Sequence, residues 1–376
     1  MKLASKVGQL LMAGFDGTTP SKEIRDLIKR HHIGGVILFS RNIKNPTQCA
    51  RLTEALQKLS SDAPLLIAVD QEGGRVSRLP PPFTQFPSAR TVGQCDSISL
   101  TYSCAEAIAK ELLTVGINTN FAPVLDVDTN PKNPIIGDRS FGKSPTIVSK
   151  HGLAMTVGML DQKVIACGKH FPGHGDTAAD SHETLPQIDH PVSRLADLEL
   201  KPFIHVVENR IPCMMTAHVR YRHFDERLPA SLSKRIVGEL LRKTIRFEGV
   251  VVTDDLEMGG ITGNFSVPHA AVKAIQAGAD LILVCHSPEQ QTAVLEALVH
   301  AVEKGTLSEA RLNESLSRLL ALKERFLLPH RPAPSHLIKQ VVGCESHRTL
   351  VKEIKRKSRT AIKERSKQEM EKRGAR

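Results

Sequence analysis

The sequence predicts an α/β protein that forms a single (β/α)8 barrel of the TIM type with a basic C-terminal tail. Eight short runs rich in Val, Ile and Leu alternate with amphipathic segments of helical period. Strands of a parallel sheet are buried on both faces, so their sequences are near-continuous apolar runs. Eight such runs within about 290 residues favour a closed barrel over an open doubly wound sheet. Polar residues follow several different runs and not one switch point, which supports the same choice.

Each expected strand is an apolar run that a Gly, Pro or Asp cluster follows. In chain order these strands are Gln9–Phe15, Gly35–Phe39, Leu65–Val69, Thr119–Val127, Val164–Gly168, Pro212–His218, Gly249–Thr253 and Leu281–Cys285. The segments between them repeat apolar residues at helical spacing, which predicts the covering helices. These are Glu23–Lys29, Thr47–Leu59, Cys104–Val115, Ile147–Leu160, Ala196–Glu208, Ser233–Ile245, Pro268–Ala277 and Glu289–Lys304, with Glu309–Phe326 packed outside.

We expect two parts in the chain, a barrel domain at residues 1–328 and a Pro-containing linker with a basic tail at 329–376. The stretch Lys352–Arg376 holds eleven Lys and Arg against four Glu, so it carries +7 of the total charge of +11. This part is weakly apolar and helix-prone, which predicts a frayed helix or a disordered segment. The barrel is close to neutral, and we therefore do not expect nucleic acid as its main partner.

Composition argues against several classes of protein. The chain has no Trp and only 4% aromatic residues, which disfavours a stacking platform for nucleic acid or long polysaccharide. No glycine-rich phosphate loop, export signal or membrane span is recognised, and we expect no cofactor. The seven cysteines are widely spaced without a C-x-x-C motif, which favours reduced thiols in a cytoplasmic protein over a structural zinc site.

The most informative segment is Lys169–His182, which packs three histidines and two aspartates into fourteen residues. A Pro and two Gly end the preceding apolar run as a turn. The polar residues are therefore expected on a loop that leaves a strand, where barrel enzymes keep their chemistry.

Within this segment, Asp180 and His182 are two residues apart, which places both side chains on one side of an extended loop. The carboxylate can then hold one imidazole nitrogen and leave the other facing a substrate. Such a pair makes the ring a competent general acid and base near neutral pH. The alternative is an exposed loop histidine without a role.

A second acidic motif, Thr253-Asp254-Asp255, ends a strongly apolar run. Two adjacent acids there are costly unless they are hydrogen-bonded. Because side chains alternate along a strand, one acid should point into the barrel mouth and the other away. Asp254 is the candidate nucleophile or base, unless both acids only cap the following helix.

Charged residues that follow the third, fourth and fifth expected strands are expected around the same mouth. They are Asp70, Arg78, Arg139, Lys169 and His170. Charged hydrogen-bond donors and acceptors of this kind can bind the hydroxyl groups of a sugar in a pocket. A metal site is the alternative for the histidine-rich segment, with ligands from His170, His174, Asp176, His182 and His218, although the spacing matches no tight metal motif.

Taken together, these motifs resemble glycoside hydrolase family 3, and within it the single-domain β-N-acetylglucosaminidases. The resemblance rests on Lys169–Asp176, Asp180–His182 and Thr253–Met258, with Val69–Val76, Asn133–Gly142 and Pro229–Ser233 in support. It extends from about Val7 to Leu327, which is nearly the whole expected barrel.

The resemblance implies a role for each candidate residue. Asp254 would be the nucleophile of a retaining mechanism, and His182, polarised by Asp180, would be the acid/base. The terminal N-acetylglucosamine would be held by Asp70, Arg78, Arg139, Lys169 and His170. The implied substrates are small carbohydrates such as muropeptides from peptidoglycan, acted on by a cytoplasmic monomer.

Larger members of this family take the acid/base from a second domain, and the segment Glu345–Ser358 resembles only the helix that leads into it. We therefore expect the barrel to supply its own proton donor from the loop of Asp180 and His182. Three alternatives remain: a glycoside phosphorylase, a metal-dependent hydrolase, and a nucleic-acid binder acting through its tail. The phosphorylase is considered because a histidine acid/base repels phosphate less than a carboxylate does.

Overall fold

The computed structural model describes residues 2–61, 63–329 and 333–374. Its centre is a closed barrel of eight parallel strands in the order β1-β10-β9-β7-β5-β4-β3-β2. The strands are β1 (Leu11–Ala13), β2 (Gly35–Leu38), β3 (Leu66–Val69), β4 (Thr119–Asn120), β5 (Ile165–Phe171), β7 (Cys213–Thr216), β9 (Val250–Asp255) and β10 (Leu281–Val284). Each lies in one of the eight apolar runs or starts there, so the predicted (β/α)8 barrel is confirmed.

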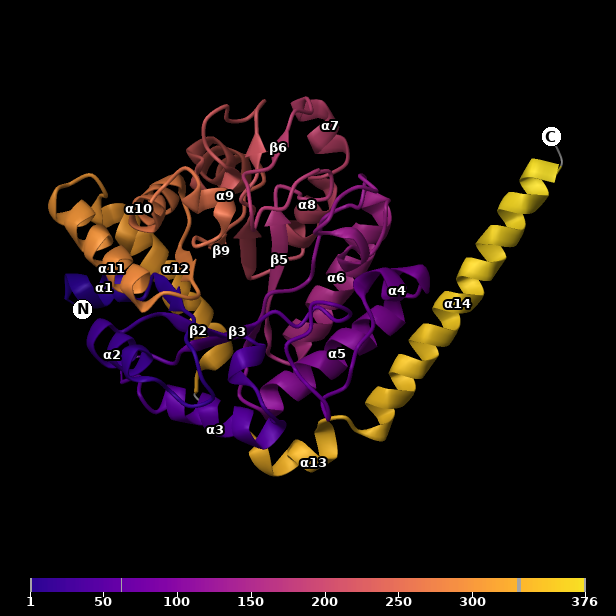
Figure 1. Cartoon of the computed structure of the whole chain (residues 1–376), viewed down its shortest axis with the longest axis horizontal. Coiled ribbons are helices and arrows are strands. Elements are labelled where there is room, and N and C mark those ends of the chain that lie inside the picture. The colour runs from indigo at the N-terminus through magenta and orange to yellow at the C-terminus, as the bar shows by residue number, and fades with distance from the viewer. Residues whose placement is uncertain (1, 62, 330–332, 375–376) are drawn as a thin grey trace.

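Helices surround the barrel (Figure 1). They are α1 (Leu3–Gly8), α2 (Lys22–His31), α3 (Pro46–Gln57), α4 (Ala89–Gln94), α5 (Ile98–Thr114), α6 (Pro145–Asp161), α7 (Val192–Asp197), α8 (Lys201–Glu208), the π-helix η4 (Arg235–Thr244), α9 (Gly259–Thr262), α10 (Val267–Ala277), α11 (Pro288–Glu303) and α12 (Glu309–Leu327). Four 3-10 turns are η1 (Ser40–Asn42), η2 (Gly137–Arg139), η3 (Ala230–Leu232) and η5 (Ser335–Leu337).

Local sequence signals explain several helix starts. The side chains of Ser21 and Asn45 accept backbone hydrogen bonds at the starts of α2 and α3, as N-cap residues do. The expected helix Ala196–Glu208 is instead two helices. Pro202 lies in the first turn of α8, where its missing N–H costs nothing.

Two strands differ from expectation at their carboxyl ends. β5 continues to Phe171 and β9 continues to Asp255, so both are longer than the apolar runs that predicted them. Lys169 and His170, which were expected on a loop, therefore lie on β5, because its pairing with β7 extends to Phe171. Asp254, which was expected at the end of its strand, lies within β9. A short parallel pair, β6 (Gln187–Ile188) with β8 (Arg220–Tyr221), was not predicted and lies above the barrel.

The amino-terminal end of β10 is held by a buried ion cluster. Asp280 is fully buried and pairs with three arginines, one from η4 and two from α12, namely Arg242, Arg311 and Arg318. Ser315 of α12 also donates to Asp280 at 2.8 Å. The cluster fixes α12 on the outside of the barrel, where the sequence places it.

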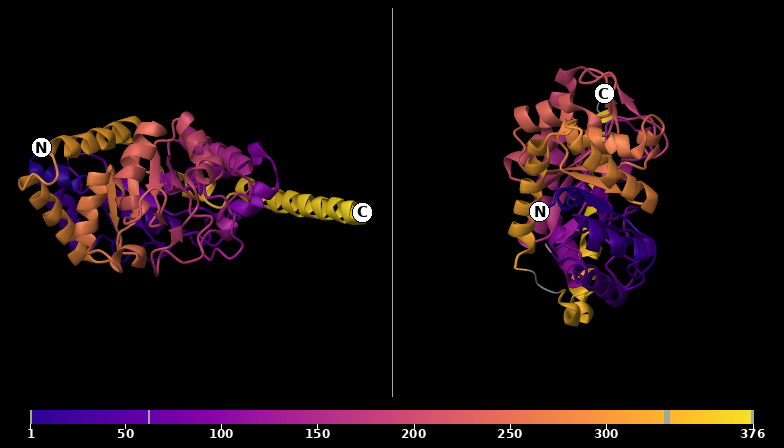
Figure 2. Two further views of the ribbon diagram at one scale, coloured as in Figure 1. Left: turned by 90° about the horizontal axis from the view of Figure 1, so that it is seen from above. Right: turned by 90° about the vertical axis from the view of Figure 1, so that its left-hand side faces the viewer.

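The C-terminal segment contains α13 (Ile338–Val341) and α14 (Glu345–Gly374). The first half of α14 packs against α4 and α5, with Ile354 buried and His347 Nδ1 2.8 Å from Glu111 Oε1. The second half projects away from the barrel (Figures 1 and 2). Among the helices in the described ranges, none combines the length and apolarity needed to cross a bilayer.

A buried lysine gives the first prediction. Lys323 of α12 is 2% exposed and donates to Gln9 Oε1 at 2.8 Å, and burial lowers its pKa to about 7. The unfolded chain, with a lysine pKa of about 10.4, binds more protons between these values, so folding stability rises with pH there. We expect the unfolding free energy of the wild type to rise by about 1 kcal/mol per pH unit from pH 7.5 to 9.5, relative to Lys323→Met.

Urea unfolding of both proteins at several pH values measures this difference. Parallel pH profiles for the two would contradict a neutral buried Lys323. The comparison uses the pH slope because Lys323→Met also leaves Gln9 Oε1 without its donor.

Candidate active site

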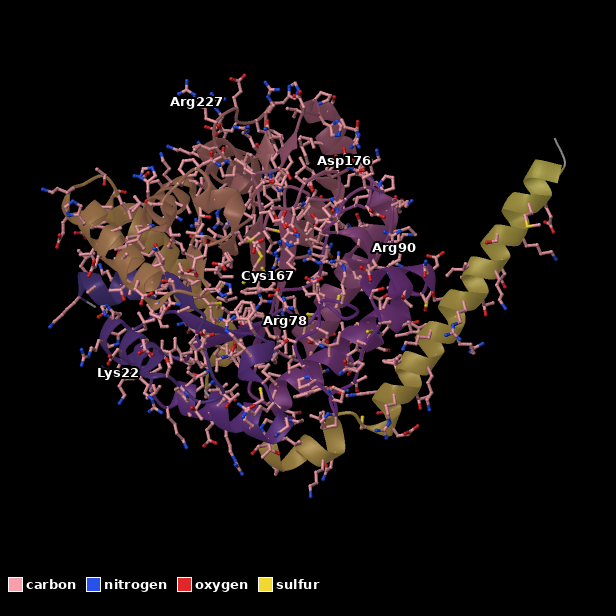
Figure 3. The ribbon with its side chains drawn as sticks, viewed as in Figure 1. Lys22, Arg78, Arg90, Cys167, Asp176 and Arg227 are labelled. Atoms are coloured by element: carbon pink, nitrogen blue, oxygen red, sulfur yellow. The ribbon has the colours of Figure 1, made fainter. Side chains whose placement is uncertain are left out.

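A cavity of about 540 Å³ lies at the carboxyl ends of the strands. All eight residues predicted for the site line it: Asp70, Arg78, Arg139, Lys169, His170, Asp180, His182 and Asp254. In the view of Figure 3, Arg78 lies over the centre of the barrel. The structure thus brings together residues from β5, β9 and the loops after β3, β4 and β5. Parallel strands direct their carboxyl ends to one face of a barrel, which explains this convergence.

The floor of the cavity on the β3–β5 side is a buried ion network. Lys169 Nζ lies 2.6 Å from Asp70 Oδ1 and 2.7 Å from Glu72 Oε1. Arg139 binds Glu72 through both its Nε (2.9 Å) and its Nη2 (2.8 Å). Burial alone would raise the pKa of Glu72, but the charges of Arg139 and Lys169 hold it well below its usual range. Glu72, Arg139 and Lys169 therefore stay ionised although all three are buried.

Glu72 was not among the predicted site residues. Its spacing of two from Asp70 on one loop was the available signal, since that spacing places both carboxylates on the same side. The sequence could not show that Glu72 neutralises two cations that lie far from it in the chain, Lys169 on β5 and Arg139 in η2.

Asp126 is a second functional residue that the sequence left without a role. It is fully buried, and its Oδ2 lies 2.7 Å from His170 Nδ1. Its Oδ1 accepts the backbone N–H of His174 at 2.6 Å. Burial opposes ionisation of Asp126, but the imidazoles of His170 and His174 lower its pKa below the ordinary value. The bond fixes the ring of His170, whose Nε2 lies 3.4 Å from Arg139 Nη2.

The two acids at the end of β9 have different surroundings. Asp254 Oδ1 accepts the N–H of Asp255 at 2.9 Å. Burial would raise the pKa of Asp254, but the imidazoles of His170 and His218 lower it, so a carboxylate is available as a nucleophile. Asp255 instead accepts the backbone N–H groups of Glu257 and Cys285, at 3.1 and 3.3 Å.

Asp180 and His182 form the predicted pair. His182 Nδ1 lies 2.8 Å from Asp180 Oδ1, which also accepts the backbone N–H of His182 at 2.7 Å. The imidazole is 62% exposed and the carboxylate 29%. The Nε2 of His182 has no hydrogen-bond partner among the residues that the structure describes. Both His182 and Asp180 line the cavity. The remaining nitrogen is free to exchange a proton with a bound molecule.

The β5–β6 loop (residues 172–186) is attached to the segment that follows Asp254. Gly259 N donates to the carbonyl of His182 at 2.9 Å, and Gly260 N donates to that of Ser181 at 3.0 Å. A Cβ at Gly259 would lie 2.4 Å from the carbonyl oxygen of Glu183, so only glycine permits this approach. The contact keeps the imidazole of His182 on the side of the cavity where β9 ends.

Two of the residues considered as metal ligands are engaged elsewhere. His218 binds Ser231 Oγ at 2.7 Å and the carbonyl of Asp255 at 3.0 Å. Asp176, toward the α7 side in Figure 3, pairs with His190. In the described ranges, no group of three or more His, Cys, Asp or Glu side chains is arranged to hold a metal ion.

A buried carboxylate, an Asp–His pair and several charged side chains line one cavity at the mouth of the barrel, and this combination is compatible with a glycoside hydrolase. The family model for the "Glycosyl hydrolase family 3 N terminal domain" matches residues 2–322. The chain therefore belongs to glycosyl hydrolase family 3.

Similar proteins agree with this assignment. A "Beta-hexosaminidase" of Alkalilimnicola ehrlichii is 41% identical over 308 residues, which are 80% of this chain and 87% of that protein. A "Beta-hexosaminidase A" of Pseudoalteromonas piscicida is 37% identical over 373 residues, or 92% of this chain, but the chain spans only 62% of that protein's length. Among solved structures, a family 3 β-N-acetylglucosaminidase from Paenibacillus sp. str. FPU-7 matches with a TM-score of 0.93 and 44% identity, over 95% of this chain and 69% of its own.

The glycine contact gives the second prediction. We expect Gly259→Ala to displace the β5–β6 loop, because the new Cβ would lie 2.4 and 2.7 Å from two loop carbonyl oxygens. Amide hydrogen exchange should then report lost protection at residues 259 and 260. Gly263→Ala, at the C-cap of the same helix, is the matched control, since its Cβ meets only the Gly259 carbonyl oxygen, at 3.1 Å. Unchanged protection in Gly259→Ala would show that the loop does not depend on this contact.

The ion network gives the third prediction. Glu72→Gln leaves the buried cations of Lys169 and Arg139 without half of their compensating charge, and we expect a loss of about 3 kcal/mol in unfolding free energy. Asp138→Asn breaks the half-exposed pair with Arg75 and should cost less than about 1 kcal/mol. Urea denaturation compares the two, and equal costs would contradict the structural role given to Glu72.

Proposed function

We propose that the protein is a retaining exo-β-N-acetylhexosaminidase that removes terminal, non-reducing N-acetyl-β-D-glucosamine. The observation that carries this proposal is the placement of Asp254 and the Asp180–His182 pair in one cavity, beside the Lys169–Glu72–Arg139 network. The names of the similar family 3 proteins support the choice of an N-acetylated amino sugar.

In the first step, Asp254 attacks the anomeric carbon while His182 gives its Nε2 proton to the departing oxygen. The C–O bond to the aglycone breaks and a glycosyl ester forms on Asp254. The lowered pKa of Asp254 supports this role, because the carboxylate must be ionised before it attacks.

In the second step, His182 takes a proton from water, which attacks the ester and restores Asp254. The sugar leaves with its original anomeric configuration, since two inversions cancel. Asp180 stabilises the imidazolium form of His182 through the 2.8 Å contact at Nδ1 and holds the ring in the useful tautomer.

The sugar hydroxyls and the acetamido group are held by the charged side of the cavity. We assign this binding to Asp70, Arg78, Arg139, Lys169 and His170. Buried ionic groups form strong, directional hydrogen bonds with hydroxyls, and they are already fixed by one another before a ligand binds. A cavity of about 540 Å³ has room for one terminal sugar and the start of its aglycone.

We propose muropeptides from peptidoglycan as the source of this sugar and the cytoplasm as the compartment, with the protein acting as a monomer. All seven cysteines are free thiols, and most are buried. Reduced cysteines in this number support a reducing compartment.

Two substitutions test the mechanism with aryl β-N-acetylglucosaminides, and this is the fourth prediction. Asp254→Ala should lower kcat/KM by at least about 10⁴-fold for every aryl group, because no nucleophile remains. His182→Ala should lose about 10²-fold with phenol as the leaving group and far less with dinitrophenol, which needs no proton. The exposed pair Asp189–His223 lies outside the cavity, so His223→Ala is the matched control and should retain full activity.

The products separate this proposal from its alternatives. In phosphate buffer, a hydrolase releases free N-acetylglucosamine, whereas sugar 1-phosphate as the main product would assign the protein as a phosphorylase. Activity in both variants equal to that of the wild type would contradict the proposed mechanism altogether.

A further inference from the structure

We propose that Ser181 and His174 are positioning residues that hold the acid/base pair over the cavity. This inference rests on the proposed function, because it concerns how the imidazole of His182 is placed for proton transfer. Neither residue is given a chemical step. Their role is to fix a loop whose reacting side chains are otherwise exposed.

Ser181 is the buried residue between two exposed ones. Its side chain is 2% exposed, whereas its neighbours Asp180 and His182 have side chains that are 29% and 62% exposed. The hydroxyl of Ser181 lies 3.0 Å from His174 Nε2, and its carbonyl accepts the N–H of Gly260 at 3.0 Å. The Asp–His pair is thus attached to the protein interior through the one residue that separates its members.

His174 is itself immobilised on three sides. It is 1% exposed, its Nδ1 lies 2.9 Å from Thr177 Oγ1, and its backbone N–H donates to Asp126 Oδ1 at 2.6 Å. Burial and the nearby charge of His170 lower the pKa of His174 to about 4. A neutral ring suits a linker between two hydroxyl groups, since it offers one donor and one acceptor.

Asp126 connects this linker to the sugar-binding side of the cavity. One carboxylate oxygen binds His170, which lines the cavity, and the other binds the backbone of His174. The chain of contacts runs from His170 through Asp126, His174 and Ser181 to His182. It therefore fixes the position of the proton donor relative to the groups assigned to the sugar.

The consequence is specific to proton transfer. A general acid must lie within hydrogen-bond reach of the leaving oxygen, and a small displacement of the donor lowers the rate steeply. Loosening the loop should therefore penalise poor leaving groups, which need the proton, and spare good ones. A general loss of structure would lower the rates for both to the same extent.

Ser181→Ala tests this with phenyl and dinitrophenyl β-N-acetylglucosaminides. We expect kcat/KM for the phenyl substrate to fall about tenfold or more and that for the dinitrophenyl substrate to fall less than about threefold. Thr184→Ala removes an exposed hydroxyl on the same loop, whose contact with the Asp180 carbonyl is long at 3.5 Å, while the backbone N–H of residue 184 still donates to that carbonyl at 2.9 Å. The Ser181–His174 bond stays intact, so both rates should stay at the wild-type level. Thermal unfolding confirms that each variant is folded.

Two substitutions of His174 provide an independent comparison. The amide of Gln reaches the position of Nε2, so His174→Gln can keep the bond to Ser181. The amide of Asn reaches only the position of Nδ1, so His174→Asn keeps the contact with Thr177 and loses Ser181. We expect the Gln variant to retain the leaving-group dependence of the wild type and the Asn variant to resemble Ser181→Ala, even if both are equally destabilised.

The outcomes distinguish the two proposals. Equal losses for both substrates in Ser181→Ala, or identical leaving-group dependence in the Gln and Asn variants, would overturn the positioning role and leave the proposed function intact. A wild-type protein that cleaves neither substrate would overturn the proposed function itself, and the positioning role with it.

Discussion

The attachment of the β5–β6 loop to the start of α9 is the contact on which the site depends. Two backbone hydrogen bonds, from Gly259 and Gly260, hold the carbonyls of His182 and Ser181. The loop leaves one strand of the barrel and reaches the segment after another, so this contact spans the cavity mouth. Without it, the exposed part of the loop, at residues 182–184, would have to be ordered at a cost in conformational entropy.

Charge is distributed differently at the two ends of the barrel. At the amino-terminal end, Asp280 forms ion pairs with three arginines and so holds α12 against the barrel. At the carboxyl end, Glu72 and Asp70 form ion pairs with Arg139 and Lys169, and these four side chains also line the open cavity. Both clusters neutralise buried charge, and only the second also presents ionised groups to a ligand. This matches the division of barrels into a stabilising end and a reactive end.

The start of helix α14 is also held by a buried carboxylate, as α12 is. Glu111 accepts hydrogen bonds from Thr84, the backbone of Gly343 and the ring of His347, so one buried carboxylate anchors the start of this helix. Beyond Ser358, which binds Gln94, the helix leaves the body, and the side chains of Arg359, Lys363 and Lys367 are exposed there. Its net charge therefore lies apart from the cavity, in keeping with a barrel that is itself close to neutral.

Local patterns of apolar and turn residues were enough to predict the barrel, its eight strands and eight of the residues that line the cavity, because strand burial and turns depend on short stretches of sequence. The sequence also placed Asp180 beside His182, since a spacing of two is a local property. It missed Glu72 and Asp126 as site residues, and it placed Lys169 and His170 on a loop instead of on β5. These points depend on the folded chain, because a buried carboxylate finds its partners on segments far apart in the sequence, and the end of β5 is set by its pairing with β7.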